Sequence, residues 1–323
     1  MLDLAAANLL SPIILSFALG LAAAFLRSDL SIPEAVAKGM SIYLLFAIGF
    51  KGGAGVAEHG VDLRLIGALV AGLVLSAGLP FIAYALLRAL SKIDSLNAAA
   101  VAAHYGSISI VTFVAATSLI DTRGIDSEGY MVAVAAIMEA PAIVAALWLV
   151  SRTGQTSNTD AGLWREILVN GSIVLLVGSF IIGAVTGKDG LEQISSFIVA
   201  PFQGVLCLFL LDMGLVAGRG LRESRGVLGG GAVAFGLLMP PIGATCGLAA
   251  ALLLGLSTGG TVLLMALAAS ASYIAVPAAM RVALPEANPS IYLTLSLGVT
   301  FPFNLTIGIP LYATVAQAVN GGG

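Results

Sequence analysis

Long apolar runs separated by short charged segments are the feature that most limits what this chain can fold into. Each run holds about 18 or more predominantly apolar residues, and a helix needs about 20 to cross a bilayer. Over 323 residues, 59% are hydrophobic and only 10% are charged, which is too little polar surface to cover a soluble domain of this length. We therefore predict an all-α integral membrane protein that lies entirely or almost entirely in the bilayer.

The interruptions between the runs define about ten predicted transmembrane helices. The second contains Pro33, Glu34 and Lys38 and is the least apolar, although the long Lys38 side chain can place its ammonium group at the interface. The first run lacks a basic segment and a small-residue cleavage site, so we interpret it as a retained span. The predicted ranges are 9–26, 32–50, 65–90, 96–120, 130–151, 164–186, 192–217, 227–255, 260–284 and 290–319.

Lysines and arginines are distributed unequally between the two sides of this predicted bundle. Cytoplasmic loops retain an excess of these residues, so the side with nine of them is predicted to be cytoplasmic and both termini external, in a plasma (inner) membrane. The net charge of -3 gives no basic field for nucleic acid. The side with nine contains Arg27, Arg88, Lys92, Arg152, Arg165, Arg219, Arg222, Arg225 and Arg281, and the other contains Lys51, Arg64, Arg123 and Lys188.

A polar segment divides the spans into two sets of five. We predict a first repeat over residues 1–151, a cytoplasmic linker over 152–163 and a second repeat over 164–323. "AIGFKGGAGV" resembles "DMGLVAGRGL" and "AAHYGSISIV" resembles "AASASYIAVP", at almost the same offset along the chain. Since each half has an odd number of spans, the two repeats are predicted to be inverted, as in secondary transporters. "MEAPAIV" and "TFPFNLTIGIP" predict a proline break in the last helix of each half.

Polar residues interrupt the fourth and ninth predicted spans at corresponding positions. "HYGSIS" and "SASYIAVP" carry hydroxyl groups beside a glycine or a proline. In inverted-repeat transporters, such interruptions lie near the membrane midplane and supply backbone and side-chain ligands. The alternative is that the hydroxyls bond back to the preceding turn of their own helix. The candidate substrate-binding residues of these segments are Gly106, Ser107, Ser109, Thr112, Ser270 and Ser272.

Three further polar side chains lie at membrane depth. Glu139 falls near the centre of the fifth span, where an ionised group costs about 2.5–3.5 kcal/mol and must face protein or water. With Thr300 and Asn304 it is a candidate ligand of Na⁺, the expected coupling ion. The alternatives are a protonated Glu139 bonded to a neighbouring helix and an Asn304 that joins helices. His104 is either a proton relay or a packed, hydrogen-bonded residue.

Enzyme motifs give little support for catalysis, because HExxH, GxSxG and phosphate-binding loops in a suitable context do not occur. The patterns favour Na⁺-coupled transport of a small anion. Two alternatives stay open: a carrier of a small organic anion driven by Na⁺ or protons, and a membrane sensor that does not transport.

Nearly the whole chain resembles the sodium-dependent bicarbonate transporter superfamily. The resemblance rests on "LSP", "IPEA", "IGFKGG", "GSIS", "MEAP", "FLLDMGLVAGRGL", "AAS" and above all "PEANPSIYLTLSLGVTFPFNLTIGIPLY". It implies inverted five-helix repeats, external termini, and a site between the broken fourth and ninth helices. It also implies bicarbonate as substrate, a homotrimer, an elevator-like motion, and a PII-like regulatory protein as a possible partner.

The chain departs from the cyanobacterial members at the site. They have Ser-Gly-Ser-Thr where this chain has "SIVT" from Ser109 to Thr112, and an aspartate where it has Tyr273, which joins the candidate substrate-binding residues. Glu139 takes the place of their aspartate in the fifth span. Bicarbonate is thus inferred from the family, and the shorter linker weakens the case for the PII-like partner.

Overall fold

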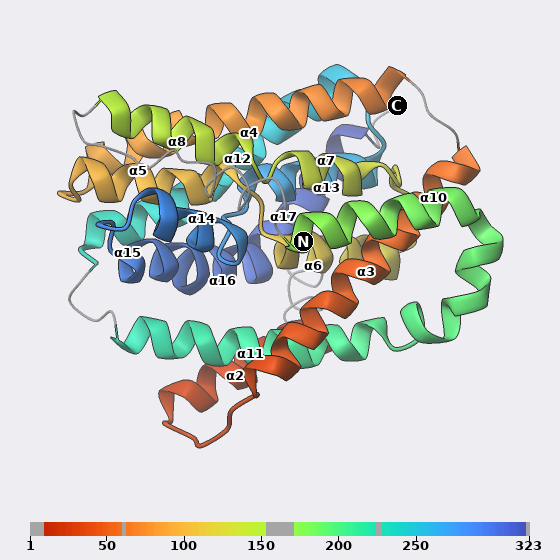
Figure 1. Cartoon of the computed structure of the whole chain (residues 1–323), viewed down its shortest axis with the longest axis horizontal. Helices are drawn as coiled ribbons and strands as arrows, with labels where there is room; N and C mark the ends of the chain where they lie inside the picture. The colour runs from red at the N-terminus through yellow and green to blue at the C-terminus, as the bar shows by residue number, and fades with distance from the viewer. Residues whose placement is uncertain (1–9, 60–62, 153–170, 224–227, 321–323) are drawn as a thin grey trace.

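The structure is a computed structural model, and it describes residues 10–59, 63–152, 171–223 and 228–320. All regular structure in these ranges is helical, and the helices run roughly along the long axis of the molecule (Figure 1). The predicted all-α membrane class is confirmed, because eight of the described segments are long and apolar enough to cross a bilayer. The remaining two predicted spans contain the shorter apolar helices Pro12–Phe25 and Thr258–Ala269.

Each of the first nine predicted spans corresponds to one helix or to a pair of consecutive helices, and the last contains three helices with two π-helical segments between them. The first half consists of α2 (Pro12–Phe25), α3 (Glu34–His59), α4 (Leu63–Leu90), α5 (Ser95–Gly106), α6 (Ile110–Thr122), α7 (Met131–Ile137) and α8 (Pro141–Arg152). The second consists of α10 (Gly171–Ile198), α11 (Phe202–Glu223), α12 (Gly230–Leu254), α13 (Thr258–Ala269), α14 (Ala275–Ala283), α15 (Pro289–Leu293), α16 (Phe301–Phe303) and α17 (Ile309–Asn320). Apart from Arg152, the predicted linker 152–163 lies outside the described residues.

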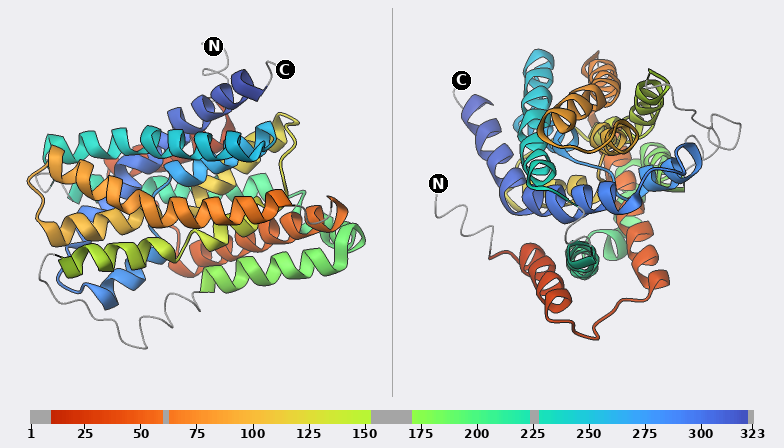
Figure 2. Two further views of the ribbon diagram at one scale, coloured as in Figure 1. Left: turned by 90° about the horizontal axis from the view of Figure 1, so that it is seen from above. Right: turned by 90° about the vertical axis from the view of Figure 1, so that its left-hand side faces the viewer.

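Four helices form a first group, in which α2 packs against α11 and α3 packs against α10. In Figures 1 and 2, α2 and α11 lie together at one edge of the bundle. Both pairs approach closely at glycines: a Cβ on Gly20 would lie 2.0 Å from the Leu211 carbonyl oxygen, and one on Gly53 would lie 1.9 Å from that of Phe180. Small residues are what lets helix backbones meet in lipid. The first helix of each half is thereby paired with the second helix of the other.

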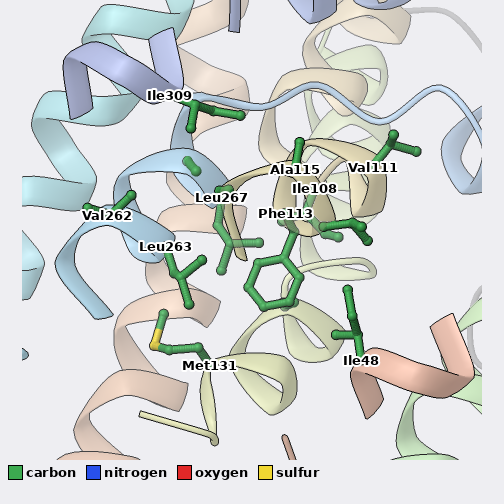
Figure 3. Packing of buried hydrophobic residues seen from close by; sticks show 14 of the residues in the cluster. Ile48, Ile108, Val111, Phe113, Ala115, Met131, Val262, Leu263, Leu267 and Ile309 are labelled. Atoms are coloured by element: carbon green, nitrogen blue, oxygen red, sulfur yellow. The ribbon is translucent and has the colours of Figure 1, made fainter. Parts of the chain in front are cut away.

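The remaining helices form a second group around the fourth and ninth spans. Both spans are split into two helices, α5 with α6 and α13 with α14, and both are almost entirely buried. Figure 3 shows Phe113 of α6 pointing toward Met131 of α7 and Leu267 of α13 in one continuous apolar cluster. The apolar core therefore surrounds the two split helices. Exposed apolar side chains such as Leu253 and Val185, 88% and 81% exposed, suit a surface that faces lipid.

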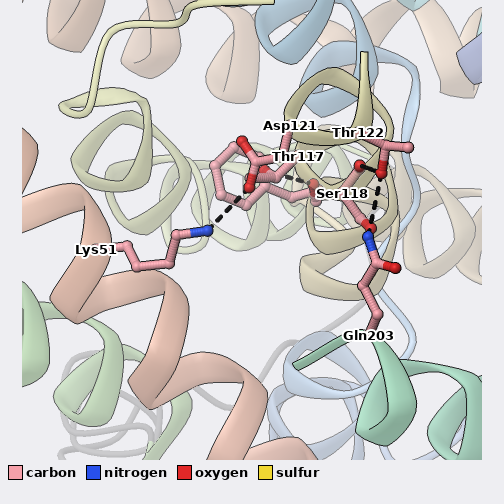
Figure 4. Close-up of polar contacts among 7 residues, drawn as sticks. Lys51, Thr117, Ser118, Asp121, Thr122 and Gln203 are labelled. Carbon is pink, nitrogen blue, oxygen red and sulfur yellow. Dashed lines mark hydrogen bonds and ion pairs between the residues drawn. The ribbon is translucent and has the colours of Figure 1, made fainter. Parts of the chain in front are cut away.

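Polar contacts join the two groups at the end of α6. Lys51 Nζ of α3 lies 2.9 Å from Asp121 Oδ2, and Gln203 Nε2 of α11 donates to Thr122 Oγ1 at 3.1 Å (Figure 4). The Lys51 and Asp121 side chains are 31% and 46% exposed. Two neighbouring residues of α6 are thus tied to two different helices of the first group.

The predicted proline break in the last span is wrong. The first half does break at "MEAP", between α7 and α8. In the second half, however, the helix continues from Pro289 to Asn320. Pro302 lies within it, between the π-helical segments Thr294–Thr300 and Asn304–Gly308. A π-helical turn shifts the hydrogen-bond pattern by one residue and so accommodates a proline without ending the helix.

One predicted helix end is also wrong. The second span, predicted to end at residue 50, continues as α3 through the glycine-rich segment "KGGAGVAEH" to His59. Close packing of Gly53 against α10 outweighs the low helix propensity of its glycines. The predicted end of the sixth span at residue 186 is confirmed, because Gly187 leaves the helical conformation with a φ of 60° that favours glycine, and a further helical stretch follows to Ile198.

Substitution at Gly53 tests the glycine packing. We expect Gly53→Ala to lower the thermal unfolding temperature of the detergent-solubilised protein, because overpacking costs about 1–3 kcal/mol. Gly178→Ala on α10 is the matched control, since a Cβ there meets nothing within 4 Å. Equal unfolding temperatures for the two variants would contradict the close approach of α3 and α10.

Candidate functional site at the two helix breaks

The fourth and ninth spans are interrupted by short extended segments with the same geometry. Ser107 follows the last residue of α5 with a ψ of 160°, and Ser270 follows the last residue of α13 with a ψ of 165°. The segments bond to each other: Ser109 N donates to Ser270 Oγ at 2.8 Å, and Ser272 N donates to the His104 carbonyl at 2.7 Å. Each break therefore provides a hydrogen-bond acceptor for a backbone N–H group that has no helical partner in the other break.

Helix α4 supports the first break through Gly106. A Cβ on Gly106 would lie 2.4 Å from Pro80 Cγ and 2.6 Å from the Ser76 carbonyl oxygen. Ser76 Oγ in turn donates to the Met138 carbonyl at 2.7 Å, at the break between α7 and α8. Gly106 thus serves close packing with α4, and α4 fixes the position of the segment that carries Glu139.

A small cavity lies between the breaks and the first group of helices. It has room for about one water molecule, with a volume of about 10 Å³. Four of the predicted site residues line it, and the structure adds two serines that sequence reasoning missed, Ser41 of α3 and Ser172 of α10. A single serine in an apolar helix gives no signal of its own. The lining consists of Ser41, Leu45, Ile108, Ser109, Ile110, Glu139, Ser172, Ser272, Tyr273 and Ile274.

Oxygen atoms dominate the polar groups at this cavity. Glu139 is 3% exposed, and its carboxylate accepts a hydrogen bond from Ser107 Oγ at 3.2 Å. The Tyr273 hydroxyl is buried and interacts with the Ser109 side chain. The Thr112 hydroxyl is buried without a hydrogen-bond partner among the described residues, but Thr112 does not line the cavity. The oxygens of Glu139, Ser109 and Tyr273 are therefore the candidates for contact with an ion bound there.

Thr300 and Asn304 do not line this cavity. Thr300 Oγ1 donates to the Gly236 carbonyl at 2.7 Å and lies 2.6 Å from the Tyr105 hydroxyl. Asn304 Nδ2 donates to the Ala269 carbonyl at 2.8 Å, while its Oδ1 accepts from Tyr312 at 2.9 Å. Both ends of the Asn304 amide are engaged, so its contacts favour the role of joining helices.

His104 joins the two breaks through two bonds to one residue. Its carbonyl accepts from Ser272 N, and its Nδ1 lies 2.6 Å from the Ser272 carbonyl oxygen. Since that oxygen can only accept, Nδ1 carries the proton. The ring stacks on Tyr292 with a centroid distance of 4.5 Å. These contacts favour the packed, hydrogen-bonded role over the proton relay.

Together these features define a multi-pass membrane protein with a small cavity beside two split helices, lined by one carboxylate and several hydroxyls. No group of three or more histidine, cysteine, aspartate or glutamate residues suited to a metal ion occurs in the part of the chain that the structure describes. Such an arrangement is typical of secondary transporters.

Comparison with protein families identifies the transporter class. The model of the Na⁺-dependent bicarbonate transporter superfamily matches residues 12–317, and the chain belongs to this superfamily. A comparison with curated proteins gives no match.

Substitution of His104 distinguishes the two roles considered for it. We expect His104→Ala to lower the free energy of unfolding by about 1–3 kcal/mol, because it removes the donor to the buried Ser272 carbonyl. His104→Asn keeps a donor close to the position of Nδ1 and is expected to retain more of the stability and of the transport activity in proteoliposomes. A folded His104→Asn protein without uptake would favour the relay instead.

Proposed function

We propose that the protein is a secondary active transporter that couples the entry of Na⁺ to the import of a small anion, with bicarbonate as the first candidate. The small cavity at the two helix breaks carries this proposal. It combines one buried carboxylate, several hydroxyls and the amino ends of two helices, α6 and α14.

The cavity suits a monovalent cation on one side of the breaks. Helices α5 and α13 end at Gly106 and Ala269, and the carboxyl ends of helices carry negative partial charge and exposed carbonyl oxygens. Glu139 adds a full negative charge when it is ionised. A carboxylate is unfavourable in the membrane by itself, so a Na⁺ ion beside Glu139 stabilises the ionised form, and Glu139 in turn strengthens Na⁺ binding.

The other side of each break suits an anion. Helices α6 and α14 begin at Ile110 and Ala275, and the amino end of a helix offers backbone N–H groups and positive partial charge. Ile110 and Ile274 both line the cavity, so these two helix ends lie next to it. Because the closed cavity holds about one water molecule, an anion of a few heavy atoms requires less opening than a larger organic anion.

The arrangement of helices supports an elevator-like mechanism with inverted repeats. The reciprocal pairing of α2 with α11 and of α3 with α10 is what two repeats related by a two-fold axis produce. In this mechanism the group around the split helices moves along the group formed by the two pairs. The homotrimer and a PII-like regulatory partner are proposed from the family alone.

Uptake in proteoliposomes tests the function directly. Labelled bicarbonate and small carboxylates are supplied with and without a Na⁺ gradient, and separately with a pH gradient. Na⁺-driven bicarbonate uptake supports the proposal, and Na⁺- or proton-driven uptake of a carboxylate identifies the alternative carrier. The absence of uptake and of counterflow for every anion would favour a membrane sensor.

Neutralisation of Glu139 tests the coupling. We expect Glu139→Gln to raise the Na⁺ concentration for half-maximal uptake by about tenfold or to abolish coupled uptake, because the charge that stabilises Na⁺ is lost. Glu192→Gln, at an exposed position on α10, is the control. An unchanged Na⁺ curve in the Glu139 variant would remove this residue from the coupling mechanism.

Cysteine labelling tests the proposed orientation. Asp29 and Asp126 are exposed residues on opposite sides of the predicted bundle. In a background without Cys207 and Cys246, we expect a membrane-impermeant maleimide to label Asp126→Cys in intact cells and Asp29→Cys only after permeabilisation. The reverse pattern would invert the topology.

A further inference from the structure

A second, larger cavity lies next to the small one. Its volume is about 730 Å³, and it is formed by residues of α3, α11 and α14 and of the last span, together with the ninth break. The two cavities share lining residues, so the larger one is a space through which an anion can pass between the small cavity and the side of the bundle that carries the arginines. Its lining consists of Glu34, Val216, Ala217, Arg219, Gly220, Tyr273, Ile274, Pro277, Arg281, Leu293, Thr294, Leu297 and Gly298.

Two arginines are among the residues that line this larger cavity. Arg219 of α11 and Arg281 of α14 line it together with one carboxylate, Glu34. The buried Asp212 carboxylate, which does not line the cavity, interacts electrostatically with Arg219 and offsets part of its charge. Arg219 donates to the Leu30 carbonyl at 2.8 Å, and Arg281 interacts with the Tyr292 side chain. A guanidinium has five N–H donors and stays protonated, so donors for an oxyanion remain after these contacts.

Tyr273 and Ile274 line both cavities. These two residues therefore form the wall between them. Tyr273 belongs to the non-helical segment between α13 and α14, and its ring packs edge-to-face on Phe301 at a centroid distance of 5.4 Å. A side chain on a non-helical segment can be displaced without unwinding a helix.

We propose that Arg219 and Arg281 form an anion-binding vestibule and that the Tyr273 side chain is the barrier between it and the substrate cavity. The ligand is a small oxyanion or carboxylate of the same class as the transported substrate. The inference rests on the proposed function, because it assigns the route between that site and the predicted cytoplasmic side, on which Arg219 and Arg281 lie. It also gives Tyr273 a steric role that a hydroxyl ligand alone does not have.

Cysteine modification tests the vestibule without measuring transport. Val216→Cys lies on the cavity wall at a position that is 41% exposed. The measurement uses purified detergent-solubilised protein without native cysteines. The quantity of interest is the ratio of two rates, that of the introduced cysteine with an anionic methanethiosulfonate reagent and that with a neutral methanethiosulfonate reagent. We expect Arg281→Gln to lower this ratio by roughly threefold and Arg219→Gln with Arg281→Gln to lower it by roughly tenfold.

Controls separate charge from folding. Arg281→Lys keeps the charge and is expected to retain the ratio, and added salt is expected to reduce the ratio in the parent protein. A ratio that is the same with and without the arginines would overturn the vestibule.

A cysteine in the small cavity tests the barrier. We expect Ser109→Cys to react slowly with the anionic reagent in the parent protein and in Tyr273→Phe, and at least about tenfold faster in Tyr273→Ala, which removes the wall. Equal rates in Tyr273→Phe and Tyr273→Ala would overturn the barrier. Because both measurements are independent of uptake, an arginine-dependent ratio in a protein that transports no anion would contradict the proposed function and leave the vestibule in place.

Discussion

The mutual satisfaction of two helix breaks is the interaction on which the rest of the structure depends. In a bilayer, an unpaired backbone N–H or carbonyl has no water to bond with and costs several kcal/mol. The fourth span can leave the helical conformation at Ser107 because the ninth span is also non-helical next to it. Ser109 N donates to Ser270 Oγ, and Ser272 N donates to the His104 carbonyl. Neither break is stable without the other, so the site is a property of both halves of the chain.

The same requirement explains the neighbouring packing. Gly106 lets α4 approach the first break, and on the other side Gly243 of α12 lies against the Ala268 carbonyl, where a Cβ would be 2.1 Å away. Asn304 donates a hydrogen bond to the Ala269 carbonyl at the end of α13. Small residues and one amide thus pack around the breaks, and a small cavity remains beside Glu139. Some of the polar side chains that the sequence predicts as ligands, such as Asn304, instead form hydrogen bonds within the protein around the breaks.

Residue patterns predicted the all-helical membrane class and the places of the two matched breaks, because a polar segment within an apolar run is local information. They did not predict that Thr300 and Asn304 lie away from Glu139, since this depends on how the last span passes Pro302 through π-helical turns. The patterns also did not predict the length of α3, because contact of Gly53 with α10 decides it rather than helix propensity. Ser41 and Ser172 reach the cavity only through packing of their helices.

Electrostatics gives a reason why cation and anion would have to bind together at such a site. An ionised Glu139 repels an anion about 5 Å away by about 3 kcal/mol at an effective dielectric constant of about 20, which is enough to weaken binding by about a hundredfold. A Na⁺ ion between them removes this repulsion and replaces it with attraction. The exposed contacts of Lys51 with Asp121 and of Gln203 with Thr122 join the two helix groups. Exposed ion pairs contribute about 1 kcal/mol or less, so these contacts cost little free energy to break. Weak exposed links between the two helix groups are what the proposed movement of one group along the other requires.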